Sequence, residues 1–84
     1  MFIIKKHYEA TENNCDFSGV VIDYYKGRRG ETLSKNELPC KYFIEEYGFK
    51  TKAAASRALK AEKELCDSEN EYGWWNVSAS IMEV

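Results

Sequence analysis

Hydrophobic and polar positions alternate in three stretches of the chain, which is the pattern of half-buried β-strands. These stretches, 2–8, 17–26 and 74–83, are rich in β-branched and aromatic side chains that suit a pleated surface. In the last stretch Trp75 begins a run in which every second residue is apolar, whereas Trp74 belongs to the alternate, more polar register. We therefore predict three strands, with Trp75 facing a core and Trp74 pointing away from it.

A helical periodicity follows Thr51, whose side chain is a favoured N-cap, and strong helix formers come directly after it. We predict a helix over 52–67. Its apolar side comprises Ala54, Ala55, Ala58, Leu59, Leu65 and Cys66. Glu62 falls near the middle of that side, and we expect it at the rim with its carboxylate in water. The alternative is a carboxylate desolvated beneath the sheet.

The stretch 41–47 fits two patterns. As a strand it is rich in β-forming side chains, and it would add to a sheet that is poorly stable with only two strands. As a helix, Phe43, Ile44 and Tyr47 form one stripe, and Gly48 is a natural C-terminal stop. We favour the strand, and the alternative is that 36–47 is helical.

Several strands with one long helix predict an α+β fold of two layers. We expect a small antiparallel or mixed sheet with strands near 2–8, 17–26, 41–47 and 74–83, covered on one face by the helix 52–67. A chain of 84 residues can bury one modest core, so we expect a single domain, 1–84. The uncovered face would carry polar residues and surplus aromatic side chains.

Composition narrows the class of protein. An apolar fraction of 44% and an aromatic fraction of 14% are typical of a folded chain. The apolar run at the N-terminus is too short for a signal peptide or a membrane span, so we expect a cytoplasmic protein with no membrane partner. The three cysteines lack paired spacing and only His7 could join them, which argues against disulfides, metal ions and cofactors.

Catalytic motifs are absent from the sequence. It contains no nucleophile elbow, phosphate-binding Walker loop, glycine-rich dinucleotide fingerprint or paired-histidine zinc motif. We therefore expect a binding module without enzymatic activity. Short, acidic, aromatic-rich chains of this kind are typical of phage and mobile-element accessory proteins.

Two groups of basic residues indicate a candidate phosphate-binding surface: Lys26, Arg28 and Arg29 in a glycine-flanked turn, and Lys50 and Lys52 at the predicted helix start. Nearby Tyr25 or Trp74 is available for stacking on a base. The net charge of −2 and the pI near 5.4 oppose nonspecific attraction to nucleic acid. Nucleic-acid binding is therefore the alternative interpretation.

A protein partner is the favoured interpretation. Trp74 is the strongest candidate contact residue, because the alternation exposes it and indole rings are enriched among residues that dominate binding energy. Tyr25 is a second candidate. An exposed sheet edge can also pair with a second copy of the chain, which allows a homodimer. The sequence thus predicts a small regulatory or accessory protein that binds another protein.

Overall fold

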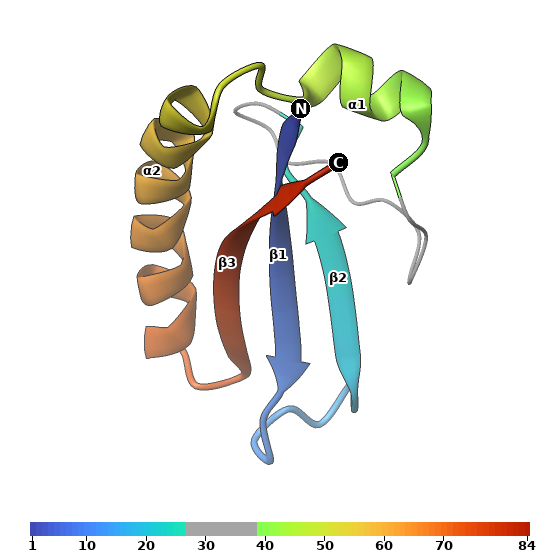
Figure 1. The fold of residues 1–84 in the computed structure, drawn as a ribbon. Coiled ribbons are helices and arrows are strands. Elements are labelled where there is room, and N and C mark those ends of the chain that lie inside the picture. Colours follow the sequence, from blue (N-terminus) through green and yellow to red (C-terminus); the bar gives the residue numbers. More distant parts are fainter. Residues whose placement is uncertain (27–38) are drawn as a thin grey trace.

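The computed structural model describes residues 1–26 and 39–84, which form an antiparallel sheet with two helices (Figure 1). The elements in chain order are β1 (Phe2–Ala10), β2 (Val20–Tyr24), α1 (Lys41–Tyr47), α2 (Lys52–Glu71) and β3 (Trp75–Glu83). The predicted α+β class is confirmed. Within the described residues, no helix is long and apolar enough to cross a bilayer.

The sheet has the strand order β2-β1-β3, with β1 in the centre and both pairings antiparallel. In the register, Tyr8 of β1 lies opposite Val21 of β2 and Val77 of β3. The chain ends meet beside the sheet, because the backbone amide of Val84 donates to the carbonyl of Met1 at 2.9 Å. The sheet is therefore antiparallel rather than mixed.

Helix α2 lies alongside β3 and covers one face of the sheet (Figure 1). Thr51 is the N-cap that the sequence predicted, and its hydroxyl oxygen accepts a hydrogen bond from the amide of Ala54 at 3.2 Å. The side chain of Ala55 is fully buried, so the first turns pack closely on the strands. The helix continues to Glu71 rather than ending near Asp67, which brings its last turn to the start of β3.

The strand that we favoured at 41–47 is wrong, because these residues form helix α1. The amide of Ile44 donates to the carbonyl of Cys40 at 3.1 Å, and the amide of Gly48 donates to that of Ile44 at 2.8 Å. Phe43 is buried on the side that faces the sheet. The helical alternative is therefore correct over this range, and its earlier part, 36–38, lies outside the described residues.

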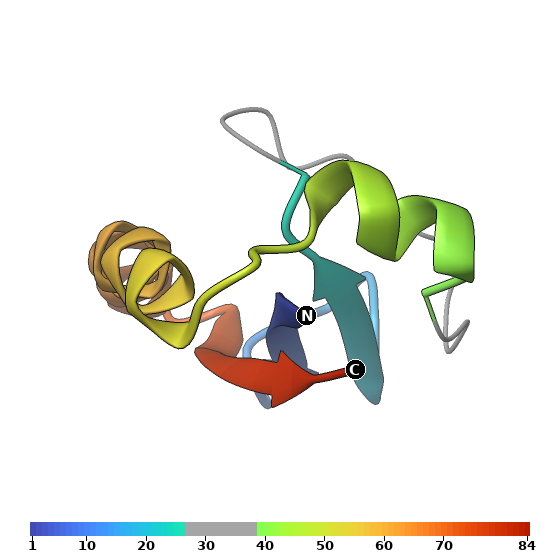
Figure 2. The same ribbon diagram turned by 45° about the horizontal axis from the view of Figure 1, so that its top comes forward.

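The prediction that only one face of the sheet is covered is also wrong. Helix α1 lies across the end of the sheet where β1 begins (Figure 2). There Phe43 packs with Ile3 and Tyr24 in a core cluster. Partly buried side chains complete the cluster, namely Ile22, Ile44, Tyr47 and Met82. Farther along the same face, Ser78 and Ser80 of β3 stay exposed.

The orientation of α2 differs from the expected one. Glu62 is 8% exposed, and its Oε2 lies 3.2 Å from Nζ of Lys6 on the central strand. Leu65 is instead 54% exposed. The buried line along α2 runs through Ala55, Glu62 and Cys66, which are spaced at whole turns of a helix. The expected rim position of Glu62 is therefore wrong, because a lysine in β1 provides a buried partner for its carboxylate.

Candidate partner-binding site

The turn that joins α2 to β3 begins with a tight helix end. Tyr72 is the C-cap, and the amide of Gly73 donates to the carbonyl of Asn70 at 3.1 Å. Gly73 has a φ of +76°, in the left-handed region that strains residues with a Cβ atom. This glycine reverses the chain in one step and places Trp74 immediately before β3.

The side chain of Asn70 fixes the end of α2 to the outer edge of β3. Its Nδ2 donates to the carbonyl of Val77 at 3.1 Å, and its Oδ1 accepts from the amide of Val77 at 2.6 Å. The amide group thereby occupies the hydrogen-bonding positions that a neighbouring strand would use. The start of β3 is held in register with the last turn of the helix.

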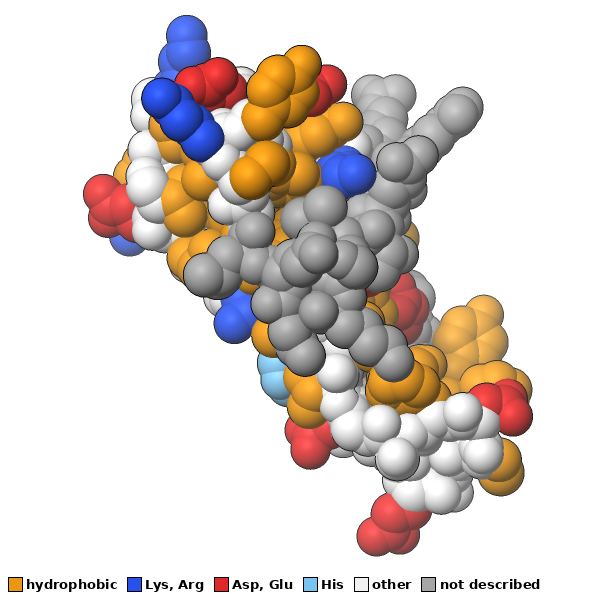
Figure 3. Space-filling model, turned by 90° about the vertical axis from the view of Figure 1, so that its right-hand side faces the viewer, with side chains coloured by type: hydrophobic (Ala, Val, Ile, Leu, Met, Phe, Trp, Pro, Cys, Tyr) orange, Lys and Arg blue, Asp and Glu red, His pale blue; other side chains and the backbone are white. Residues whose placement is uncertain are grey.

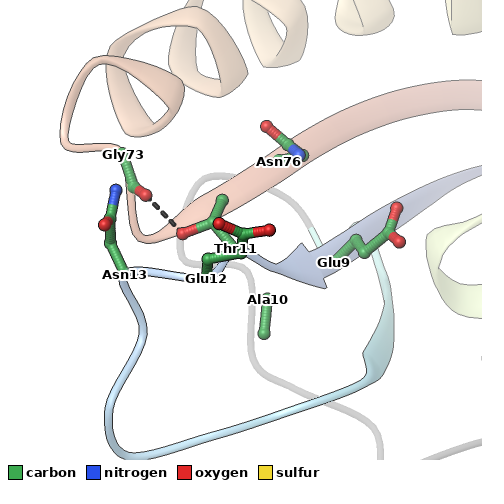
Figure 4. Close-up of a pocket in the computed structure, with 7 residues that line it drawn as sticks. All are labelled: Glu9, Ala10, Thr11, Glu12, Asn13, Gly73 and Asn76. Atoms are coloured by element: carbon green, nitrogen blue, oxygen red, sulfur yellow. Dashed lines mark hydrogen bonds between the residues drawn. The ribbon is translucent and has the colours of Figure 1, made fainter.

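The connection between β1 and β2 holds the other side of the turn. The amide of Thr11 and Nδ2 of Asn14 both donate to the carbonyl of Trp74, at 3.1 and 3.3 Å. The hydroxyl of Thr11 donates to the carbonyl of Gly73 (Figure 4). Asn14 is itself fixed, because its Oδ1 accepts from the amide of Phe17 at 3.0 Å. The carbonyl of Trp74 is therefore held by two donors from the β1–β2 connection.

The two adjacent tryptophans have opposite environments. Trp75 packs inward, with its ring centroid 5.3 Å from that of Phe17 and 6.2 Å from that of Tyr8. Trp74 is 58% exposed and Tyr72 is 80% exposed. The prediction that Trp74 points away from the core is confirmed. A partly buried aromatic cluster thus supports two exposed rings at one end of the sheet.

These exposed rings border a hollow of about 250 Å³, which we call the aromatic hollow. Its lining consists of Glu69, Tyr72, Trp74 and Trp75. A second, more polar hollow of about 520 Å³ lies on the other side of Gly73, and we call it the polar hollow (Figure 4). Its lining consists of Glu9, Ala10, Thr11, Glu12, Asn13, Gly73 and Asn76. One turn therefore separates a mainly aromatic surface from a more polar one.

This end of the molecule is acidic. The segments 9–19 and 67–77 contain no Lys or Arg. Their carboxylates are Glu9, Glu12, Asp16, Asp67, Glu69 and Glu71. In the view of Figure 3, the lower end shows acidic and hydrophobic side chains without a basic one. The surface around both hollows therefore has a negative potential.

Several titratable side chains lie between β1 and α2, next to the aromatic cluster. Burial raises the pKa of Tyr8 above its ordinary value. Burial alone would lower the pKa of Lys6, but Tyr8 and the Glu62 carboxylate reverse this and raise it. Burial also raises the pKa of the Cys66 thiol, which makes it a poor nucleophile. These groups hold the sheet and α2 together rather than face the hollow.

Tyr25 does not join Trp74. It follows β2 at the end of the sheet where β1 begins, and its amide donates to the carbonyl of Ile4 at 3.0 Å. Its ring stacks on Phe49, with centroids 5.9 Å apart. The two candidate partner-binding residues therefore lie at opposite ends of the sheet.

The basic candidates that the structure describes share the end that carries Tyr25. Nζ of Lys26 lies 5.9 and 5.7 Å from the ring centroids of Phe43 and Tyr47, so this lysine packs against α1. Lys50 and Lys52 are exposed at the start of α2. The stacked Tyr25 and Phe49 each precede a basic residue, which brings Lys26 and Lys50 to one region. Arg28 and Arg29 lie outside the described residues.

Sequence reasoning missed Glu69 and Tyr72, because it ended the helix near Asp67. The signal was present in the helical spacing, since Glu69 comes three residues after the buried Cys66. Gly73 was a second signal, because glycine commonly follows the last residues of a helix. Extending the helix to that glycine places Glu69 and Tyr72 in its last turn.

Within 1–26 and 39–84, no group of three or more His, Cys, Asp or Glu side chains could hold a metal ion. Comparison of the chain with protein-family models, curated proteins and solved structures gave no match.

Proposed function

We propose that this protein is a non-enzymatic, cytoplasmic binding module that docks a protein partner at the α2–β3 turn. One observation carries the proposal. Trp74 exposes more than half of its surface, although two donors from the β1–β2 connection fix its carbonyl. An accessory or regulatory role, as in phage and mobile elements, fits a module of this size.

The fixed backbone matters for affinity. Binding a partner orders flexible groups, and each ordered side chain subtracts from the free energy of association. At the α2–β3 turn, the backbone of Trp74 is already held, and the aromatic cluster beneath it is packed. A large exposed ring on a fixed backbone is the arrangement of an interface hot spot. Little ordering would remain when a partner covers Trp74 and Tyr72.

Photo-crosslinking tests this proposal. A photoreactive phenylalanine derivative replaces Trp74 in one variant and Tyr42 in a control variant, because Tyr42 is 76% exposed on α1. We expect the first variant, expressed in its native host, to capture one defined protein that the control does not capture. With that protein purified, Trp74→Ala should lower its affinity while Tyr42→Ala leaves it unchanged. Equal capture at both positions, or an unchanged affinity, would refute the proposal.

Nucleic-acid binding is the second candidate function, with the turn predicted from the sequence at Lys26–Arg29 and the Lys50–Lys52 helix start as its surface. The observation that favours it is the stacking of Tyr25 on Phe49, which brings Lys26 and Lys50 to the same end of the sheet. A gel-shift titration at low salt tests it. The expected result is binding that weakens steeply with salt and that is lost on replacing Arg28 and Arg29 by alanine. Absent or salt-independent binding would eliminate this candidate.

A further inference from the structure

We propose that the partner presents an arginine side chain, within a basic segment, to the aromatic hollow. This inference rests on the proposed function and specifies the chemistry of the partner. A guanidinium group stacks on aromatic faces and also pairs with carboxylates. The surface of the hollow is almost entirely apolar and includes the rings of Tyr72, Trp74 and Trp75, and Glu69 is the lining residue that carries a carboxylate.

Charge complementarity selects a cationic occupant. The segments 9–19 and 67–77 around the two hollows contain carboxylates but no Lys or Arg. The last turn of α2 contains no basic residue, so the negative end of its dipole has no cationic side chain of its own nearby. An acidic partner would be repelled by this surface, whereas a basic segment would be attracted to it.

The size of the hollow selects a single side chain. Its volume of about 250 Å³ is smaller than the range of roughly 300–1,000 Å³ that is typical of sites for small molecules. The neighbouring polar hollow carries Glu9 and Glu12 on the far side of Gly73. A further basic residue of the same segment would lie against these carboxylates once the arginine occupies the aromatic hollow.

Peptide binding tests the inference directly. The probe is a short, fluorescently labelled peptide in which arginine alternates with glycine and serine. Its control is the same peptide with citrulline in place of arginine, which keeps the shape and removes the charge. Fluorescence anisotropy measures affinity without using the protein's own tryptophans. We expect binding of the arginine peptide that weakens as salt rises, and at least about tenfold weaker binding of the citrulline peptide.

Variants locate the binding site. Trp74→Ala should weaken binding of the arginine peptide about fivefold, as expected for loss of one cation–π contact. Glu69→Gln should weaken it at least about threefold. The matched controls are Tyr42→Ala and Glu64→Gln, which remove an exposed ring on α1 and a carboxylate elsewhere on α2. These controls should bind like the wild type, and circular dichroism confirms that each variant is folded.

The outcomes separate this inference from the function beneath it. Equal binding of the arginine and citrulline peptides, or equal effects of Glu69→Gln and Glu64→Gln, would overturn the arginine proposal. If the crosslinked partner still requires Trp74 in that case, the docking function stands without the arginine. If the partner is also indifferent to Trp74→Ala, both proposals fail. If the Trp74 and Glu69 variants lose binding of the arginine peptide and the two control variants do not, the result supports both the arginine proposal and the docking function.

Discussion

Breaking the ion pair between Lys6 of β1 and Glu62 of α2 should strongly destabilise the fold. Its Nζ–Oε2 distance is 3.2 Å, and the side chains of Lys6 and Glu62 are only 14% and 11% exposed. Removing one partner of a buried pair leaves an uncompensated charge and costs about 3–5 kcal/mol. A domain of this length has a total stability of about 4–13 kcal/mol. Loss of one partner should therefore remove a large part of the stability.

The two single variants should not be equivalent. Lys6 also lies opposite Asp23 in the register of β1 and β2. Burial raises the pKa of the Asp23 carboxyl group, and the charge of Lys6 offsets part of this increase. Lys6→Met leaves two carboxylates without their cation, whereas Glu62→Met leaves a lysine that still faces Asp23. We expect Lys6→Met to be the more destabilising variant. The double variant should be more stable than Lys6→Met, because apolar side chains can replace the Lys6–Glu62 pair. It should not regain the part of the loss that comes from Asp23, which still lacks its cation.

Urea denaturation at pH 7, followed by circular dichroism, measures all four proteins of this double-mutant cycle. Lys63→Met is the control, since it removes an exposed lysine of α2 and should change stability by less than about 0.5 kcal/mol. If both single variants lose less than about 0.5 kcal/mol, the pair behaves as a solvated surface pair. That result would refute the argument from burial.

Four further predictions concern the fold and the site. Asn70→Ala should destabilise the protein by about 1–3 kcal/mol in urea denaturation, because it leaves the amide and carbonyl of the buried Val77 without their partner. A neutral effect would show that this clamp, the pair of hydrogen bonds between Asn70 and Val77, does not stabilise the fold. Thr51→Ala should cost about 1 kcal/mol by loss of the N-cap, whereas Thr51→Ser should retain most of it. Burial raises the pKa of Asp23 in the folded state, so the stability linked to this group is present at low pH and is lost as pH rises through the folded pKa. Asp23→Asn should therefore raise the melting temperature at pH 7. It should also flatten the dependence of the melting temperature on pH above the ordinary pKa of an aspartate. Trp74→Ala should leave the melting temperature nearly unchanged, and a large decrease would show that this exposed ring belongs to the core.

Local periodicity predicted those elements whose environment repeats along the chain. The alternation after Trp75 placed β3 correctly, and Thr51 marked the start of α2, because each signal needs only neighbouring residues. The same approach gave the wrong prediction for 41–47. Its side chains favour a strand, but packing of Phe43 on Ile3 and Tyr24 selects the helix. Gly48, which follows the last turn, was the more informative residue.

The features that sequence could not supply depend on residues far apart in the chain. Glu62 could not be placed without its partner Lys6, and no spacing rule joins a carboxylate in a helix to a lysine in another element. The clamp of Asn70 on Val77 likewise requires the helix end and the strand to be placed first. For the candidate site, the orientation of Trp74 was predictable from alternation. The hollow around it was not, because it needs the true end of α2.

The charged side chains at the two ends of α2 interact unfavourably with the helix dipole. Its first turn contains no acidic residue and its last turn contains no basic one. Lys52 instead lies at the positive end of the helix dipole, and Glu69 and Glu71 lie at the negative end. The opposite arrangement would stabilise the helix by about 0.3–1 kcal/mol per charge. The basic partner that we propose would neutralise the carboxylates beside the aromatic hollow together with the end of the helix.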